Sequence, residues 1–553
     1  MENTRKLLHW NNPQASRIES IQPTLIIGIV LIIILGGLTG INPLLGMMSA
    51  LLLFLWVLVA SRPILIVYGL VLILPLTGGL ARGAVVPFLR VGQALLLLAF
   101  ILFLLARSSP LGKSRLTAID LAFALFFLSE AVFPVLALYS RGEHLYLNDT
   151  NNIYGVTPIQ TLLGPLQYYL LYRIVVATIS SEKQIKIVLE LSFIASIIVS
   201  VIGILEKVMP SVRTFIETYY PPIGPSTIIP DYEVRIASTL QFYNGLASYL
   251  DFAIVLALAC YVAEKRLRIQ PLLLVTTILL STIALVLTGT FAAWIGLAVG
   301  ALVVFILFKR LPKLVIVILF GVALAALIFQ PFLSARLNQQ LGLGAAQGLV
   351  PQSLAFRIKL WQEIFLPAIG QHLLFGDGPA PAVLQFWSVE ESQYLHLLLR
   401  GGLFYLFSYL LLIGVAMITC WRQIKSKSSD ARYPVAIALL SILIALSVMN
   451  VSNEYFTLAG GAQIIWLLLA VVVASMQFRS EGSSAPVEQI QDNQLRVRNV
   501  TLFKRFDMPP PAVMGDPADS SLARKDSPFI SQLNHHSHTE KHRPPSKVYP
   551  GRH

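Results

Sequence analysis

The chain has 553 residues, of which 56% are hydrophobic and only 12% are charged, with a mean hydropathy of +0.72. Soluble globular domains carry about 25% charged residues, so this composition excludes a soluble enzyme or binding domain. The net charge of +13 is explained by basic membrane-flanking loops and a basic tail, and it does not call for a nucleic-acid partner.

Apolar residues gather in about fourteen runs, each close to the 20 residues with which a helix crosses a bilayer. The runs lie near residues 23–39, 43–60, 63–79, 91–107, 117–138, 160–178, 185–206, 244–263, 270–289, 291–308, 313–330, 393–419, 433–449 and 456–477. We expect the polar tail at 1–22 to precede a membrane anchor and not a signal peptide, because no small-residue cleavage motif follows the first run. We therefore predict an all-α polytopic membrane protein, with a transmembrane bundle over 23–330 and C-terminal transmembrane helices over 393–477.

Basic residues recur in every second short connection, which the positive-inside rule assigns to the cytoplasm together with both termini. These residues are Lys113, Arg115, Lys183, Lys186, Lys265, Arg266, Arg268, Lys309, Arg310, Lys313, Arg422, Lys425 and Lys427. Only the connection that holds Arg82 and Arg90 is basic but falls on the outer side. The number of membrane spans in the first third of the chain could therefore differ by one helical hairpin. We expect a multi-pass protein of the cytoplasmic (inner) membrane.

Three longer connections then fall on the outer face, at 139–159, 207–243 and 331–392, and connections of this length are often functional. The tail at 478–553 lacks periodic apolar residues, so we expect it to be disordered in the cytoplasm. The chain has no GxxxxGK[ST] phosphate loop, and its outer connections have no DxD or HExxH motif. The sequence therefore predicts no cofactor, no metal and no nucleotide-driven pumping.

The outer connections carry cations suited to a phosphorylated ligand. Guanidinium groups are planar forks of donors that match phosphate oxygens, and a lipid carrier's pyrophosphate is the ligand expected at a bilayer surface. The arginines are Arg213, Arg235, Arg336 and Arg357. Alternatively each arginine pairs with a lipid headgroup or a nearby acid, and the acids are Glu217, Asp231 and Glu233.

The stretch WSVEESQYLHLLLRGGLFYLF, residues 387–407, joins a polar cluster to an apolar helix. If the helix begins near Glu391, the side chains of Ser392, His396 and Arg400 share one face. At 1.5 Å per residue Arg400 lies on the order of 13 Å below the outer surface, too deep to stay without a carboxylate. The predicted intramembrane polar network consists of Arg400 with Asp251 or Glu130.

Four stretches resemble the O-antigen ligase and O-antigen polymerase superfamily of integral membrane glycosyltransferases. The first is RIASTLQFYNGLASYL, which begins at Arg235, and the second is FRIKLWQEIFLPAIGQHLLFGDGP, which holds Arg357, Trp361 and a G-x-G turn. The third is ESQYLHLLLRGGL, similar to the family's His-Asn-x-Tyr-Leu stretch, and the fourth is TFAAWIGLAVG, which occupies the place of a Ser-Arg-Gly-Ala-Trp motif. The chain departs from the family at Phe291, where the fourth motif has arginine, and at Glu391, where ligases have histidine.

The resemblance implies a C-type glycosyltransferase-like bundle and transfer of a glycan from polyprenyl pyrophosphate to an acceptor hydroxyl, with inversion. It assigns Glu391 as general base, with His396 second, and a carboxylate at Glu391 indicates a polymerase-like or exopolysaccharide-like member. The pyrophosphate would be held by Arg235, Arg357 and Arg213. Sugar rings would stack on Trp361, Tyr219 or Tyr220, unless these aromatic residues simply mark the membrane interface.

The expected partners are the lipid-linked donor, a glycan or lipid-linked acceptor, membrane lipids and other polysaccharide-assembly proteins. A second function class stays open, because some members of the superfamily are labelled bicarbonate transporters and the polar network could serve an ion pathway. A third possibility is a scaffold in an envelope-polysaccharide complex. The depth of the polar residues distinguishes the glycosyltransferase from the transporter, since a transporter needs a polar route to both faces of the membrane.

Overall fold

The computed structural model describes residues 62–80, 90–106, 116–133, 136, 158–220, 235–240, 242–263, 268–309, 314–341, 352–378, 381–385, 390–426 and 432–483. All the regular secondary structure within these ranges is helical. Every predicted apolar run from 63–79 onward coincides with a helix. The runs at 23–39 and 43–60 lie outside the described residues.

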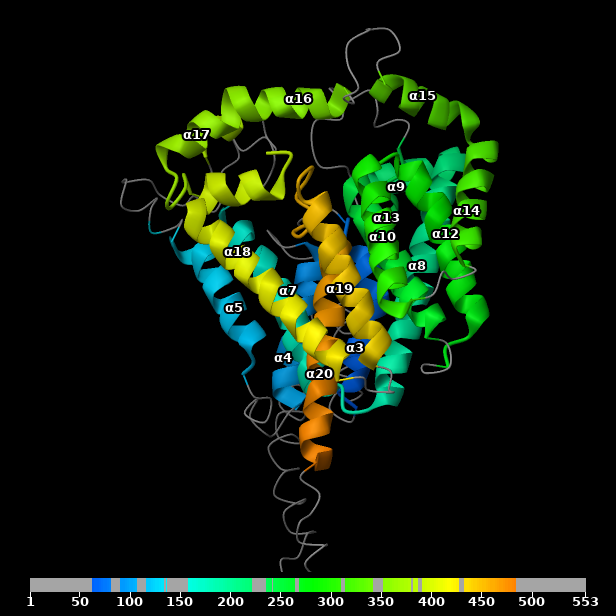
Figure 1. Cartoon of the computed structure of the whole chain (residues 1–553), viewed down its shortest axis with the longest axis vertical. Helices are drawn as coiled ribbons and strands as arrows, with labels where there is room; N and C mark the ends of the chain where they lie inside the picture. Colours follow the sequence, from blue (N-terminus) through cyan, green and yellow to red (C-terminus); the bar gives the residue numbers. More distant parts are fainter. Residues whose placement is uncertain are drawn as a thin grey trace, which may run out of the picture. The chain divides into compact units, whose positions relative to one another are not determined.

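The helices are identified here by their bounds (Figure 1). They are α3 (Ile64–Thr77), α4 (Val91–Ala106), α5 (Ala118–Phe127), η2 (Leu128–Val132), α7 (Pro158–Thr178), α8 (Glu182–Val208), α9 (Pro210–Tyr219), η4 (Ser238–Leu240), α10 (Tyr243–Val262), α12 (Pro271–Thr288), α13 (Phe291–Phe308), α14 (Leu314–Ile328), α15 (Gln330–Leu341), α16 (Gln352–Leu360), η5 (Trp361–Phe365), α17 (Leu366–Gln371), η6 (Ala382–Gln385), α18 (Gln393–Lys425), α19 (Arg432–Met449) and α20 (Gly461–Ser483).

The described part of the chain has 6 helices that are long and apolar enough to cross a membrane, or up to 7 if a bent pair counts as one span. The six are α8, α10, α12, α13, α18 and α19. Three shorter apolar helices, in α3, α4 and α20, accompany them. The chain is therefore a helical multi-pass membrane protein, and the predicted number of about fourteen spans stays a prediction.

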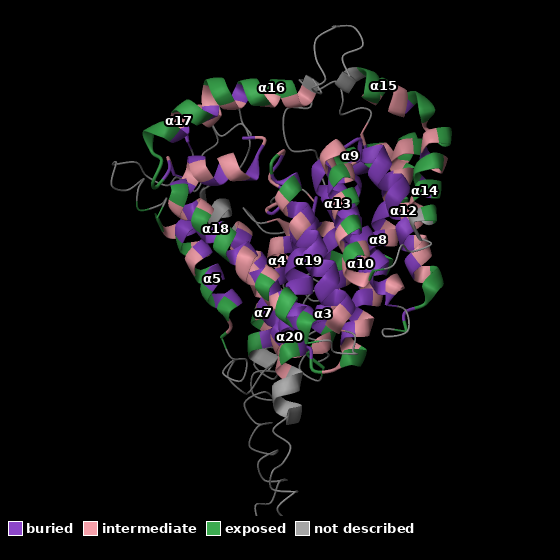
Figure 2. Cartoon of the chain, in the orientation of Figure 1, coloured by how far each residue is buried: buried purple, intermediate pink, exposed green. Residues whose placement is uncertain are grey.

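Helix α10 forms the centre of the bundle. Every residue from Asn244 to Cys260 is buried, and the helix packs against α8, α12, α13, α19 and α20. Figure 2 shows the same concentration of buried residues along α19. A helix that is apolar on all sides must be surrounded by others, which explains why α10 lacks an exposed polar face.

After α14 the chain turns away from the direction of the spans. The helical segments Ile318–Ile328 and Gln330–Asn338 are bent by 91° to one another. Pro331 lies at the turn, and proline cannot continue the hydrogen-bond ladder of α14 because it lacks an N–H group. Helices α15, α16 and α17 then run across the end of the bundle (Figure 1), so the predicted connection at 331–392 is largely helical.

Helix α18 is broken at Gly402, where φ is 65° and ψ is −161°. A Cβ there would overlap the backbone of Leu374 and Phe375, so only glycine admits this approach. The carbonyls of Leu399 and Arg400 accept hydrogen bonds from the amides of the turn that follows α17, at 2.7 and 3.0 Å.

The break corrects the prediction of one continuous helix with Arg400 deep in the bilayer. The first segment, Gln393–Gly401, runs across the bundle beneath α16 and α17 before the remainder turns along the bundle (Figure 1). The polar face that holds His396 and Arg400 therefore lies along the end of the bundle. The depth estimate assumed that Gln393–Gly401 runs in the same direction as the rest of α18, and the break at Gly402 removes that assumption.

Candidate functional site

The centre of the candidate site is an ion pair between α16 and the segment that precedes α18. Arg357 donates from Nε and Nη2 to Oε2 of Glu391, at 3.0 and 2.9 Å. Both side chains keep 23% of their surface exposed, so the pair lies at a boundary between protein and surroundings. The sequence predicted both residues as site residues, and the structure brings them into direct contact.

Glu391 has a left-handed backbone, with φ of 56°, which is uncommon for a residue with a side chain. Such a conformation costs on the order of 1 kcal/mol and persists only where surrounding contacts fix it. Two contacts do so here: the indole Nε1 of Trp361 donates to the carbonyl of Glu390 at 3.1 Å, and the amide of Gln393 donates to the carbonyl of Asn450 at 2.9 Å. The backbone reversal separates the neighbouring acids, because Glu390 is 1% exposed whereas Glu391 faces Arg357.

Glu390 belongs to a second, buried group that we call the acid–histidine cluster: Glu390, His396, Arg400 and Glu454. Nδ1 of His396 lies 3.3 Å from Oε1 of Glu390 and 3.3 Å from Oε1 of Glu454. Nε of Arg400 donates to Oε1 of Glu390 at 3.1 Å. Glu454 comes from the connection between α19 and α20, so the cluster joins that connection to the first segment of α18.

The two carboxyl groups of the cluster differ in acidity. Burial works to raise the pKa of Glu390, but Arg400 and His396 outweigh it and hold that pKa well below its usual range. Burial raises the pKa of Glu454, which His396 counteracts in part and Glu390 increases. Glu390 is therefore the permanent anion of the cluster, and Glu454 is the carboxyl group that takes up a proton more readily.

The cluster also offers three possible metal ligands, since one atom each of Glu390, His396 and Glu454 lies within 4.8 Å of the others. The guanidinium of Arg400 already contacts the Glu390 oxygen that such an ion would need. A dication there would meet that cation at close range in a buried environment. The donor set fits an ion-pair network better than a metal centre, and we assign no metal to it.

Arg235 is held at the turn between α12 and α13. Its Nε donates to the carbonyl of Thr288 at 2.6 Å and its Nη2 donates to Oγ1 of Thr290 at 2.9 Å. The guanidinium lies over the ring of Tyr243, 3.2 Å from the centroid. Oγ1 of Thr290 in turn lies 3.2 Å from Oδ1 of Asn244, so the fourth family-like stretch and the start of α10 position this arginine together.

Tyr455 interacts electrostatically with both arginines. Burial raises the pKa of its hydroxyl group, and Arg357 and Arg235 both act to lower it. Both cations therefore lie near this tyrosine, which is 1% exposed and follows Glu454 directly. The structure thus brings Arg357 and Glu391 into contact, and Arg235 interacts electrostatically with the tyrosine that Arg357 also affects.

The other predicted site residues lie on or beside α9. Arg213 pairs with Glu217 of the same helix at 2.8 Å, which is the acid partner that the sequence left open as an alternative. The hydroxyl group of Tyr220 donates to the carbonyl of Leu76 at 2.9 Å and ties the end of α9 to α3. Tyr219 is 54% exposed and its ring contacts Phe215. Sugar stacking by either tyrosine stays a prediction.

The predicted intramembrane polar network needs a correction. Arg400 pairs with Glu390, whereas both carboxylate oxygens of Asp251 lack a hydrogen-bond partner within the described residues. Asp251 lies beside Gly296 and Met449 in the core of the bundle. Glu130 is buried in η2 and interacts electrostatically with His396 and Arg400. The partner was missed because Glu390 reaches Arg400 only after the chain reverses at Glu391.

Sequence reasoning also missed Glu454 and Tyr455 as parts of the site. Both lie in the short connection between the runs at 433–449 and 456–477, where an acid beside a tyrosine looks like an ordinary loop. A usable signal was the polar sequence Asn450–Glu454 between two strongly apolar helices. Its contact with residues some sixty positions earlier, as in Ser392 to Asn450 at 3.4 Å, depends on tertiary packing.

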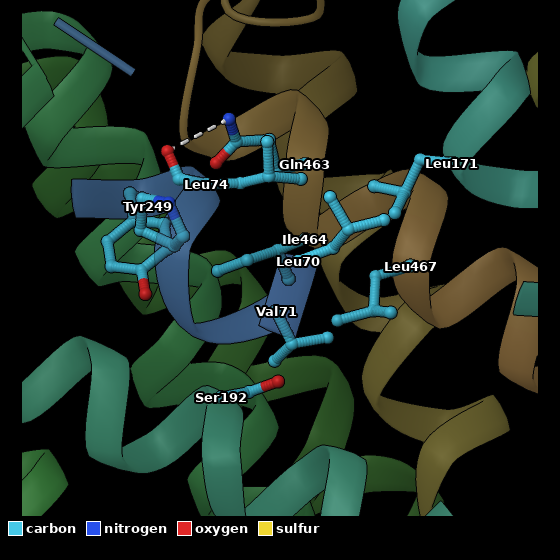
Figure 3. A pocket seen from close by; sticks show the side chains of 10 residues that line it. Leu70, Val71, Leu74, Leu171, Ser192, Tyr249, Gln463, Ile464 and Leu467 are labelled. Atoms are coloured by element: carbon cyan, nitrogen blue, oxygen red, sulfur yellow. Dashed lines mark hydrogen bonds between the residues drawn. The ribbon is translucent and has the colours of Figure 1, made fainter. Parts of the chain in front are cut away.

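A small cavity lies elsewhere in the bundle, among α3, α7, α8, α10 and α20 (Figure 3). Its volume of about 20 Å³ suffices for a single water, and its lining is mostly aliphatic. Gln463 projects from α20 and donates to the carbonyl of Leu74 at 3.5 Å, while its Oε1 lacks a partner among the described residues. This cavity does not include Arg235, Arg357 or Glu391, and it is too small for a sugar.

Comparison with known families places this site in context. Residues 276–410 match the family model described as O-Antigen ligase. The matched segment contains the turn that holds Arg235 as well as Arg357, Glu390, Glu391 and His396 themselves. No curated protein matches the chain significantly. This match confirms the resemblance predicted from the sequence: over residues 276–410 the chain is similar to the O-antigen ligase family.

Proposed function

We propose that this protein transfers or polymerises an oligosaccharide carried on polyprenyl pyrophosphate, at the outer face of the cytoplasmic membrane. The O-antigen ligase family domain supports membrane glycosyltransferase activity in general. The observation that carries the specific proposal is the ion pair between Arg357 and Glu391; Arg235 supports it, because Arg357 and Arg235 both act electrostatically on Tyr455.

Glycosyl transfer from a pyrophosphate donor makes two demands on the protein. Negative charge grows on the departing pyrophosphate, and fixed cations in a poorly hydrated site stabilise it effectively. Arg357 and Arg235 supply those cations. The acceptor hydroxyl group must also lose a proton as it attacks the anomeric carbon, which requires a base near an oxocarbenium-like centre.

The ion pair links these two demands. A pyrophosphate carries more negative charge than a carboxylate, so a bound donor competes with Glu391 for Arg357. Glu391 then loses its partner, and its carboxylate can accept the proton of the acceptor hydroxyl group beside the sugar that reacts. In this proposal Glu391 is the general base, His396 is the second candidate, and Trp361 positions the segment through the carbonyl of Glu390.

Gene deletion in the host organism tests the proposal. We expect the surface glycans to lose their high-molecular-weight ladder if the protein is a polymerase, or to accumulate on the lipid carrier if it is a ligase. Complementation with Arg357→Ala should fail, whereas Lys359→Ala should succeed, because Lys359 is 70% exposed on the same helix. Unchanged glycans with altered bicarbonate uptake would refute the proposal and favour transport.

A further inference from the structure

The segment 235–240, which begins with Arg235, is bound to the last turns of α8. The carboxylate of Glu206, on α8, accepts hydrogen bonds from two consecutive backbone amides of this segment. Oε2 of Glu206 lies 3.2 Å from the amide nitrogen of Ala237 and 2.7 Å from that of Ser238. Hydrogen bonds to a carboxylate are stronger than those between neutral groups, so Glu206 fixes the direction of both peptide groups.

The backbone at Ser238 depends on this anchor, because it is left-handed, with φ of 51°. Such a conformation is unfavourable for a residue with a side chain and persists only where surrounding contacts fix it. The amide contact with Glu206 is one of them, and Oγ of Ser238 donates to the carbonyl of Val199 at 2.8 Å. Gly203 allows the close approach, since a Cβ there would lie 3.0 Å from Cδ1 of Ile236.

The same segment decides where the side chain of Arg235 begins. Its guanidinium group is held at the turn between α12 and α13, whereas its backbone is held by the residues that follow it. The amide of Ile236 donates to the carbonyl of Leu287 over a long 3.5 Å, and the next two amides donate to Glu206. Thr239 binds α3 at the far end of the segment. Glu206 therefore fixes the backbone from which Arg235 projects.

We propose that Glu206 is a positioning residue, which sets the backbone at 237–238 so that Arg235 meets the pyrophosphate of the donor. This inference rests on the proposed function, in which Arg235 is a cation at the leaving group. Glu206 acts through Arg235 and does not touch the donor. A misplacement of about 1 Å in a group that holds the reacting part of a substrate can cost on the order of 10²-fold in rate.

The competing role for Glu206 is that of a counter-ion, because Arg213 and Lys207 both interact electrostatically with its carboxylate. Positioning needs an acceptor oxygen at the right place, whereas a counter-ion needs a negative charge. Oε2 alone accepts from both amides, so Glu206→Gln keeps the positioning contacts and removes the charge. Glu206→Asp keeps the charge and withdraws the oxygens by one methylene group.

The binding of polyprenyl pyrophosphate to the full-length protein in lipid nanodiscs tests the inference. We expect Glu206→Gln to bind within about 2-fold of the wild type, and both Glu206→Asp and Glu206→Met to bind about 10-fold more weakly. Methionine has a similar length and lacks the carboxylate oxygens. Glu190→Gln is the control on the same helix, at an acid that is 29% exposed and pairs with Lys186, and it should leave the affinity unchanged.

A double-variant cycle shows whether Glu206 acts through Arg235. Arg235→Ala should weaken binding by about 10-fold or more, because a charge-assisted contact to the pyrophosphate is lost. Adding Glu206→Asp to that variant should weaken binding no further, since the group that Glu206 positions is already absent. A general structural role for Glu206 would lower the affinity by the same factor in both backgrounds.

Wild-type affinity in a folded Glu206→Met variant, a loss of affinity in Glu206→Gln, or additive losses in the double variant would each overturn the inference. If Glu206→Met does not fold, wild-type affinity in Glu206→Asp overturns it. Failure of the proposed function looks different: the wild type does not bind polyprenyl pyrophosphate, or Arg235→Ala binds it with wild-type affinity.

Discussion

At the scale of residues, the neighbouring acids Glu390 and Glu391 contact different arginines because the backbone of Glu391 is left-handed. The left-handed conformation of Glu391 directs its side chain to Arg357 and leaves Glu390 inside the acid–histidine cluster. The sequence predicted Arg357, Glu391 and Arg400 as important, because charged residues near a membrane need partners. The sequence could not predict which acid pairs with which arginine, since the pairing depends on the left-handed backbone of Glu391, a conformation usually marked by glycine.

The Arg357–Glu391 pair allows a prediction that separates function from stability. The double exchange Arg357→Glu with Glu391→Arg keeps an ion pair between the two positions and should recover much of the thermal stability that each single exchange loses. Activity should stay at least about 10²-fold below wild type, because the cation no longer projects from α16 toward the pyrophosphate. Thermal unfolding checks the recovery of stability and glycan transfer checks the loss of activity, both measured on the wild type, the two single variants and the double variant.

Recovery of transfer together with stability in the double variant would contradict the proposed role. The pair would then be structural, and either orientation of the charges would serve.

At the scale of elements, the spans were predictable and their interruptions were not. Long apolar runs predicted α8, α10, α12, α13 and α19 within a few residues, because helix length in a bilayer follows from its thickness. Helix α18 was predicted as one span, although it contains two segments. The double glycine at Gly401 and Gly402 permits a close approach of another backbone, but the backbone that approaches, at Leu374, lies in another connection.

Gly402→Ala tests the break in α18. A Cβ at this position combines a positive φ with overlap against the backbone of Leu374 and Phe375, so we expect a loss of stability of about 2 kcal/mol or more. Gly414→Ala is the matched control in the same helix, because no atom lies within 4 Å of its added Cβ. The control should be neutral or slightly stabilising, since alanine favours helix over glycine.

Equal melting temperatures for Gly402→Ala and Gly414→Ala would show that α18 is continuous in the membrane. The polar face with His396 and Arg400 would then descend into the bilayer as the sequence first predicted.

At the scale of the whole molecule, polar chemistry is concentrated at one end of an apolar bundle. Helices α15 to α17 run across the end where the first segment of α18 lies (Figure 1), and α16 and α17 carry many exposed residues (Figure 2). Composition and hydropathy predicted the class of the protein, and four short motifs predicted its family. The site itself joins residues from 235, 357, 390–400 and 454–455, which only the folded bundle brings together.

The most direct measurement of the central claim is transfer by the purified full-length protein in liposomes, with a radiolabelled oligosaccharide on polyprenyl pyrophosphate and a glycan acceptor. We predict that wild type and Lys359→Ala release polyprenyl pyrophosphate and extend the acceptor at equal rates. Arg357→Ala should be slower by about 10²-fold or more, because one cation at the leaving group is lost. No release by the wild type, or equal release by Arg357→Ala, would contradict the claim that these arginines hold the pyrophosphate of a glycan donor.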